Sequence, residues 1–210
     1  MLRPPRQEDL EEEFCISSVT VVDWFNFCRE VCVYWADKHS SKLGGPGCTV
    51  KIDEAKIGHR KYNRGRLLKG NWIFGGFERE SKKIFIMPVE NRSEETLLAC
   101  IKYWIMPGTT IISDCWKSYQ CLNNEGFQHL TVNHTYNFVD PDSGAHTQNI
   151  ERVWREVRAN IPRYGRREYH LERYLCEFLF KRAYAKKDRI ENFFDLIAEL
   201  YPPLSVTEET

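Results

Sequence analysis

The spacing of apolar residues predicts a helix followed by a block of strands. Between residues 17 and 38 apolar side chains recur at helical intervals, which is typical of one helix capped by Ser17 or Ser18. A linker rich in Ser and Gly follows at 40–47. Short apolar runs then predict three strands, the last two paired as an antiparallel ribbon, at 49–53, 71–78 and 83–89.

Beyond residue 90 the predicted helices and strands alternate. Ser93 and the acids after it begin a helix that Pro107 and Gly108 end, and the next strand, 109–113, is apolar enough for the centre of a sheet. The remaining predicted elements are a short helix at 117–123, a strand at 128–133, a helix from Glu151 to about Asn160, and helices near 168–186 and 190–201. This order predicts an α/β fold with a mixed five-stranded sheet flanked by helices.

These elements group into four expected segments. They are an acidic, disordered lead-in at 1–16, a helical segment with its linker at 17–47, the sheet-forming core at 48–165, and C-terminal helices at 166–210. No apolar run approaches the ~20 residues that span a membrane. The eight cysteines form no C-x-x-C pair, which argues against a structural zinc site. We therefore expect an intracellular protein with reduced thiols.

Charge is balanced over the whole chain but uneven within it. Thirty Lys and Arg offset thirty Asp and Glu, so the net charge does not indicate a nucleic-acid partner. Residues 152–173, however, carry seven Arg against three Glu. A second basic segment has no acid and contains Lys56, Arg60, Lys61, Arg64, Arg66 and Lys69. Both segments are candidates for contact with phosphate groups, although a solvated surface has the same composition.

Three acids occupy positions where a fold places metal ligands. Asp53 and Asp114 each close a predicted strand, and Glu151 lies at the start of a predicted helix. Open sheets bind ligands at the carboxyl ends of their strands, and hard divalent cations prefer oxygen ligands. Side chains alternate along a strand, so only one of Asp53 and Glu54 faces such a site. We favour Asp53; the alternatives are Glu54 as the ligand or two solvated acids.

Glu151, Arg155 and Arg158 form one stripe of this last helix. The adjoining stripe is apolar, is expected to be buried, and consists of Ile150, Val153, Val157 and Ile161. A carboxylate beside two guanidinium groups suits a metal ion together with the DNA phosphate that the metal activates. The alternative is a surface ladder of ion pairs, which contributes roughly a few tenths of a kcal/mol.

Four motifs follow one another along the chain. They read I-D-E at 52–54, W-I-F-G-G-F-E-R at 72–79, I-S-D-C-W-K-S-Y at 112–119 and G-A-H-T-Q-N-I-E-R-V-W at 144–154. With 36 residues between Asp114 and Glu151, the chain resembles the DDE transposases of the Merlin and ISXO-type insertion-sequence group. The resemblance covers residues 17–185 and implies an RNase H-like catalytic core.

The resemblance also implies a catalytic site and a reaction. Asp53, Asp114 and Glu151 are the implied triad, which holds two Mg²⁺ or Mn²⁺ ions. Water attacks a phosphodiester at the transposon end, and the resulting 3′-OH attacks target DNA. The implied partners are double-stranded DNA and a second copy of the chain, because pairing two ends requires at least a dimer. We expect no membrane partner, and a location in the nucleus of a eukaryote or the cytoplasm of a bacterium.

Further residues are expected to support this site. Arg158 matches the basic residue that often follows the third acid, and His146 and Asn149 are close enough in sequence to orient a ligand or water. The alternative for the latter two is loop or helix capping. Lys117 is a candidate DNA contact together with its aromatic neighbours Trp116 and Tyr119, which are otherwise expected in the core.

Two other functions remain open. Members of this group often carry an N-terminal zinc ribbon or helix-turn-helix region, and the roughly forty-eight residues before the first catalytic strand hold no zinc pattern. The chain is therefore also consistent with a domesticated, non-catalytic DNA-binding protein. The third possibility is an RNase H-like nuclease that acts on another nucleic acid.

Overall fold

The computed structural model describes residues 6–58, 70–132, 148–162 and 168–203. The chain divides into two compact units, one comprising Met1–His39 with Cys176–Thr210 and the other Ser40–Leu175. None of the helices in these described ranges is long and apolar enough to cross a membrane.

The first unit is helical. It contains α1 (Gln7–Phe14), α2 (Ser18–His39), most of α5 (Leu171–Ala183) and α6 (Arg189–Leu200). The Ser17 hydroxyl accepts the Thr20 N–H at 3.1 Å, so the predicted cap begins α2. Helix α1 lies in the lead-in where composition predicts disorder; its first-turn acids Glu8 and Asp9 favour the positive end of a helix.

The second unit is built on a five-stranded mixed sheet. Its strands are β2 (Thr49–Ile57), β3 (Asn71–Glu78), β4 (Ile84–Val89), β6 (Thr110–Asp114) and β7 (Gln128–Val132), in the order β4-β3-β2-β6-β7. Strand β3 is antiparallel to β2 and β4, whereas β2, β6 and β7 are mutually parallel. Two-residue strands β1 (Leu43–Gly44) and β5 (Ile105–Met106) pair separately. This order and these directions are those of an RNase H-like sheet, and the predicted fold is confirmed.

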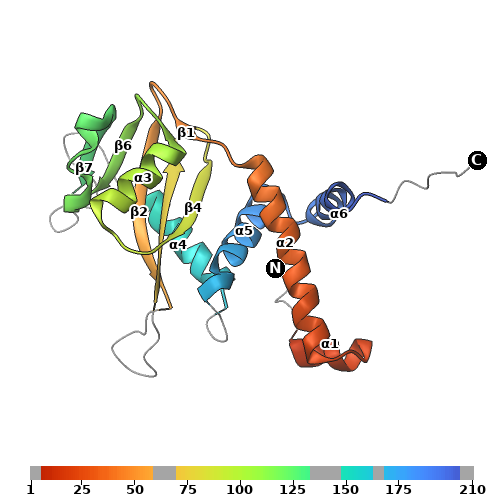
Figure 1. Ribbon diagram of the computed structural model, residues 1–210. Coiled ribbons are helices and arrows are strands. Elements are labelled where there is room, and N and C mark those ends of the chain that lie inside the picture. The colour runs from red at the N-terminus through yellow and green to blue at the C-terminus, as the bar shows by residue number, and fades with distance from the viewer. Residues whose placement is uncertain (1–5, 59–69, 133–147, 163–167, 204–210) are drawn as a thin grey trace, which may run out of the picture. The chain divides into compact units, whose positions relative to one another are not determined.

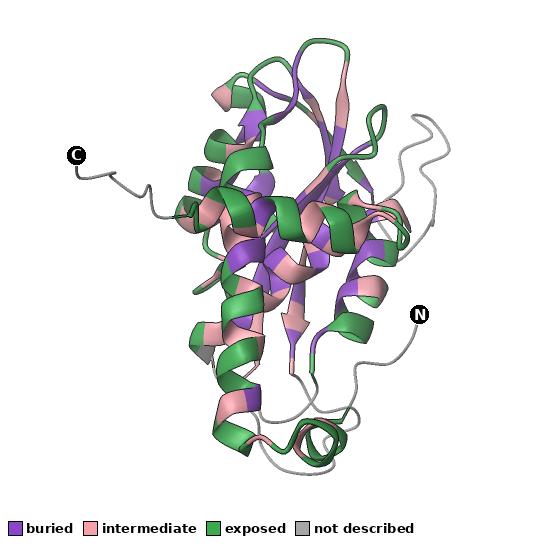
Figure 2. Cartoon of the chain, turned by 90° about the vertical axis from the view of Figure 1, so that its right-hand side faces the viewer, coloured by how far each residue is buried: buried purple, intermediate pink, exposed green. Residues whose placement is uncertain are grey.

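Helices cover both faces of this sheet. Helix α3 (Glu94–Trp104) lies on one face and α4 (Gln148–Asn160) on the other (Figure 1). The core under α3 includes Val50, Ile52, Phe74 and Ile111 from the strands and Leu97 and Ile101 from the helix. Buried residues occur in the strands and along parts of the helices (Figure 2). The sheet is thus the rigid element that positions side chains on its two faces.

The segment predicted as a helix at 117–123 forms two 3₁₀ turns, η2 (Lys117–Tyr119) and η3 (Leu122–Glu125). Tyr119 and Leu122 are both fully buried. Each turn thus contributes one side chain to the hydrophobic core under α3. The short third turn, η4 (Glu168–His170), precedes α5.

The predicted end of the first strand at Asp53 is wrong. Strand β2 continues to Ile57 because β3 pairs with it along its whole length, including Glu54 opposite Phe74 and Lys56 opposite Trp72. Its parallel pairing with β6 ends much earlier, at Lys51 opposite Ile112. Tertiary pairing therefore overrides the low strand propensity of the two acids.

Candidate active site

Asp53 and Asp114 lie at equivalent positions on neighbouring strands. Each is two residues beyond the last β2–β6 pair, Lys51 with Ile112, so both lie on the same face of the sheet and at the same level. Both side chains are half-buried. Beyond that pair β6 continues beside β7, as far as Asp114 opposite Val132. The two acids therefore flank the point where the parallel strands separate.

Asp53 is held by α4. The indole Nε1–H of Trp154 donates to Asp53 Oδ2 at 2.8 Å. Burial raises the pKa of Asp53 to about 6, against the lowering effect of this hydrogen bond and of the Glu54 backbone N–H. The negative charges of Asp114 and Glu151 raise it further. Three carboxyl groups thus influence one another at this face, where a proton or a cation on Asp53 is favoured.

Asp114 orients the chain that follows β6. Its Oδ1 accepts the backbone N–H of Trp116 at 3.1 Å, a local bond that aspartate commonly forms at a turn. The buried Ser113 beside it lies with its hydroxyl 2.8 Å from His129 Nε2. Asp114 is therefore fixed by its own turn while its carboxylate keeps a second oxygen for other partners.

Glu151 lies in the first turn of α4, on the exposed side of the helix. The predicted buried stripe of this helix is confirmed, because Ile150, Val153, Val157 and Ile161 are at most 5% exposed. Trp154 joins that stripe at 3% exposure. As they stand, Asp53, Asp114 and Glu151 do not form a group that could hold a metal ion, nor do any other three Asp, Glu, His or Cys side chains in the described ranges.

Glu54 lies on the opposite face of β2, with its carboxyl near the buried Tyr119 hydroxyl. The two groups are close enough to change each other's pKa, but Glu54 Oε1 and the Tyr119 hydroxyl have no hydrogen-bond partner of ordinary geometry within the described residues. Burial raises the pKa of Glu54 to about 7. Only Asp53 of this pair therefore shares a face with Asp114 and α4.

The other predicted site residues are spread around this face. Asn149 is half-buried at the start of α4, and Arg155 and Arg158 are exposed on the same helix. Lys117 is exposed directly after the Asp114 turn, and Lys56 is half-buried in β2. His146, Arg60, Lys61, Arg64, Arg66 and Lys69 lie outside the described residues.

The sequence left two interpretations for Trp116 and Tyr119, a contact with DNA or burial in the core, and the two residues differ in their exposure. Tyr119 is fully buried, as expected of a core aromatic, whereas Trp116 is 39% exposed. Trp154 was not singled out from sequence, although its position three residues after Glu151 places the two on neighbouring turns of α4. Its contact with Asp53 depends on a pairing of segments that are 101 positions apart.

Gly75 explains how the indole reaches the sheet. Gly75 pairs with Asp53 across β2 and β3. A Cβ atom on Gly75 would lie 2.7 Å from Trp154 Cη2 and 2.7 Å from the Phe85 carbonyl oxygen. The absence of a side chain at this position therefore lets Trp154 pack on the sheet directly beside Asp53.

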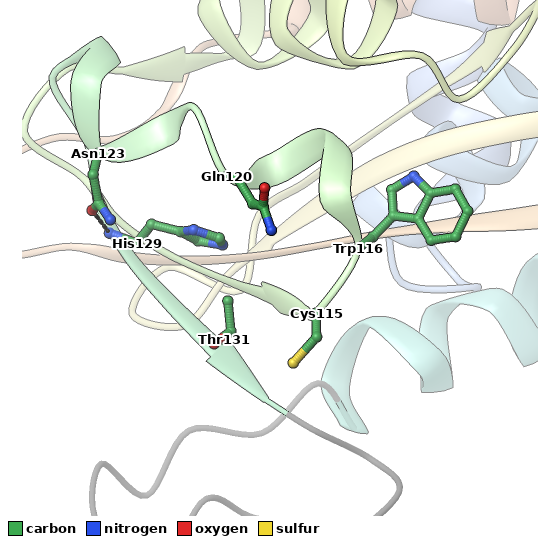
Figure 3. Close-up of a pocket in the computed structure, with 6 residues that line it drawn as sticks. All are labelled: Cys115, Trp116, Gln120, Asn123, His129 and Thr131. Carbon is green, nitrogen blue, oxygen red and sulfur yellow. Dashed lines mark hydrogen bonds between the residues drawn. The ribbon is translucent and has the colours of Figure 1, made fainter.

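A pocket of about 340 Å³ opens beside Cys115, the residue that follows Asp114. Its lining is uncharged apart from the histidine and consists of Cys115, Trp116, Gln120, Asn123, His129 and Thr131. Figure 3 shows Cys115, Gln120, His129 and Thr131 around an open space, while the Trp116 ring extends away from it. Burial lowers the pKa of His129, which favours the neutral imidazole. The pocket therefore offers polar, neutral groups close in sequence to Asp114.

The raised pKa of Asp53 predicts a stability difference between wild type and Asp53→Asn. At a pH below the ordinary value of 3.8, Asp53 is neutral both folded and unfolded. As the pH rises from there to about 6, the unfolded chain loses this proton and the folded chain keeps it, so wild type loses stability. Above that range Asp53→Asn is expected to be more stable by roughly 1–3 kcal/mol.

Urea denaturation of both proteins in EDTA, from pH 4 to pH 8, measures this difference. The gap in unfolding free energy is expected to widen up to pH 6 and then stay constant. Asp114→Asn is the matched control, because it removes a neighbouring charge while Asp53 still titrates. Parallel curves for wild type and Asp53→Asn would contradict the assigned burial of the Asp53 charge.

Comparison with known proteins relates the chain to transposases. The family model described as the ISXO2-like transposase domain matches residues 42–183. An "Uncharacterized transposase-like protein" of Haemophilus influenzae is 26% identical over 107 residues, which are 50% of this chain and 85% of that protein.

Two of the solved structures that this chain resembles are integrase domains. The catalytic core domain of BIV integrase has a TM-score of 0.44 at 16% identity and covers 73% of this chain and 97% of its own. The HTLV-2 integrase catalytic core domain in complex with magnesium has a TM-score of 0.39 at 13% identity, with 67% and 86% covered. Since the family match spans well over half of the sequence, the chain belongs to the ISXO2-like transposase domain family.

Proposed function

We propose that this chain is the catalytic domain of a DDE transposase that cleaves DNA and joins its strands with the help of divalent metal ions. Asp53, Asp114 and Glu151 are its catalytic carboxylates. The observation that carries this proposal is the equivalent placement of Asp53 and Asp114 on one face, where α4 packs and bears Glu151. Within the family, the motifs quoted above favour the Merlin group, and the core is proposed at 48–165.

The donor set fits two Mg²⁺ or Mn²⁺ ions in its chemistry. Carboxylate oxygens are the ligands that these hard cations prefer. The negative charges of Asp114 and Glu151 already raise the pKa of Asp53, and a cation would relieve that repulsion. Metal ions bound there would lower the pKa of the attacking water and neutralise the leaving oxygen.

The residues around the carboxylates have distinct proposed roles. Trp154 fixes one oxygen of Asp53 through its indole N–H and so orients the other. Arg155 and Arg158, which are exposed on α4, bind phosphates of the DNA that lies across Glu151. Lys117, close in sequence to Asp114, binds a further phosphate of that DNA. Asn149 and His146 position ligands or water. The basic segment at 56–69 follows the DNA backbone and contributes affinity that depends on salt.

The proposed substrates are transposon ends and target DNA, and the working assembly is a dimer or larger because two ends are joined. The protein then acts wherever the element's DNA lies, in the nucleus or the nucleoid. A domesticated DNA-binding protein and an RNase H-like nuclease are the other two candidates. They differ from the main proposal in whether DNA is cut and whether cut strands are joined.

The test is cleavage and joining of labelled DNA that carries the parent element's terminal repeats, with Mn²⁺. Wild type is expected to release a 3′-OH and to produce joined strands, whereas Asp114→Ala binds the same DNA and yields neither. Equal inactivity of both proteins, with DNA binding retained, would contradict catalysis and favour the domesticated protein. Cleavage of an RNA–DNA hybrid without any joining would favour the nuclease.

A further inference from the structure

Arg92 contacts two tryptophan rings at the end of the sheet where β3 begins and β4 ends. Its Cζ lies 4.0 Å from the centroid of the Trp72 ring and 4.4 Å from that of Trp116. The guanidinium group is therefore in contact with both rings and lies between them. Stacking of this kind restrains the plane of the group, which otherwise rotates freely at the end of a long side chain.

This grip leaves the in-plane N–H groups of Arg92 available. The two aromatic rings contain no carbonyl or carboxylate oxygen, so they leave the five N–H donors of the guanidinium to bind oxygen acceptors in its plane. Arg92 lies close enough to the Glu54 carboxyl for its charge to lower the pKa of that group, but no side chain or carbonyl among the described residues accepts a hydrogen bond from these donors or forms an ion pair with them. The backbone here is also fixed, because the Ser118 hydroxyl donates to the Arg92 carbonyl at 2.9 Å.

The Trp72–Arg92–Trp116 cluster, here called the sandwich, lies at the same end of the strands as the catalytic carboxylates. Trp72 is the second residue of β3 and pairs with Lys56, which lies three residues along β2 from Asp53. Arg92 follows the end of β4 at Val89, which pairs with Trp72. Trp116 belongs to the turn that the Asp114 carboxylate holds by its 3.1 Å hydrogen bond. The sandwich and Asp114 are therefore parts of one local structure.

Cations and aromatic rings alternate along this edge. The Lys56 ammonium lies 5.3 Å from the centroid of the Trp72 ring, so the order is Lys56, Trp72, Arg92, Trp116. Trp116 is 39% exposed at the end of this row. Basic groups interleaved with aromatic rings are typical of surfaces that bind the phosphates and bases of a single strand.

We propose that Arg92, held between Trp72 and Trp116, binds a phosphodiester group of the DNA strand next to the bond that the carboxylates cut. The guanidinium binds two phosphate oxygens through its in-plane N–H groups, and its fixed orientation reduces the conformational entropy lost on binding. The inference rests on the proposed function. It adds a phosphate-binding site on the face of the sheet opposite α4. The bound DNA strand would then pass around the end of β2 from one face of the sheet to the other.

The test measures DNA binding in EDTA, where no strand is cut. The probe is a short, fluorescein-labelled, single-stranded oligodeoxynucleotide, titrated by anisotropy over a series of NaCl concentrations. One lost phosphate contact is expected to lower the slope of log K against log salt by about 0.7 in Arg92→Gln and to weaken binding about 3- to 10-fold. Arg92→Lys keeps the charge and is expected to keep the slope, with weaker binding because the planar fork is lost.

Arg79→Gln is the matched control. Arg79 is exposed directly after β3, at the end of that strand opposite to Trp72, and its removal is expected to leave both slope and affinity unchanged. Thermal unfolding of each variant checks that the fold persists. An unchanged slope in Arg92→Gln, an equal loss in Arg79→Gln, or failure of wild type to bind the probe would each overturn the inference. If wild type failed to cut DNA in the separate Mn²⁺ assay while Arg92→Gln still lowered the salt slope, only the proposed function would be overturned.

Discussion

Replacing Asp53 by asparagine is expected to lower the rate of DNA strand cleavage by at least about 10³-fold, or roughly 4 kcal/mol of transition-state stabilisation. Asparagine keeps the shape and an oxygen that the Trp154 N–H can reach, but it carries no charge to hold a metal ion. Glu54→Gln is the matched control and is expected to stay within about threefold of wild type, because Glu54 lies on the other face of β2.

Single-turnover cleavage with Mn²⁺ measures these rates. The midpoint of thermal unfolding, with and without Mn²⁺, provides a second readout that does not depend on DNA. The metal-dependent rise of that midpoint is expected in wild type and Glu54→Gln and absent in Asp53→Asn. Loss of both readouts in Glu54→Gln, with Asp53→Asn active, would assign the ligand to Glu54 instead.

Replacing Gly75 by alanine is expected to destabilise the Ser40–Leu175 unit and disturb its site at the same time. The new Cβ would meet the Phe85 carbonyl and the Trp154 ring at 2.7 Å each, and a backbone carbonyl in a sheet cannot move without breaking pairing. Overpacking of this kind costs roughly 1–3 kcal/mol. The unfolding midpoint is then expected to fall by about 2–10 °C.

The effect on the site separates this change from ordinary destabilisation. Because the indole is pushed from Asp53, cleavage and the Mn²⁺-dependent thermal shift are both expected to fall in Gly75→Ala. Gly126→Ala is the control; its Cβ meets nothing within 4 Å, but its φ of +85° is strained for alanine. That variant is expected to lose stability and keep its activity.

A second substitution tests the cause of this clash. Trp154→Phe removes the outer ring that meets the new Cβ and leaves the Phe85 carbonyl in place. We therefore expect it to recover part of the stability lost in Gly75→Ala, as a positive coupling in a double-mutant cycle. A Gly75→Ala protein as stable and as active as wild type would contradict the close approach.

Local patterns predicted the helices of this fold better than its contacts. The period of Ile150, Val153, Val157 and Ile161 indicates the buried face of α4 without any knowledge of the sheet, and all four are buried. The ribbon of β3 and β4 was also predicted, because turn residues separate two apolar runs. Such features depend on neighbours in the sequence, which is why they can be read from it.

Features that depend on distant segments were missed or wrong. The extension of β2 past Asp53 requires β3 as a partner, and two consecutive acids give no sign of it. Trp154 looks like any core aromatic until its N–H meets Asp53. Arg92 belongs to none of the basic segments, and only the fold brings it between two tryptophans. Its significance therefore comes from geometry and not from local charge.

The early end of the β2–β6 pairing has a consequence for association as well as for chemistry. Beyond Lys51 and Ile112 the two strands no longer pair with each other, and strand backbone groups without a ladder partner are a route to aggregation. Charged side chains beside such an opening disfavour that pairing, and Asp53 and Asp114 lie there. We therefore expect that removing both negative charges would make this part of the sheet more prone to pair with an extended segment of another molecule.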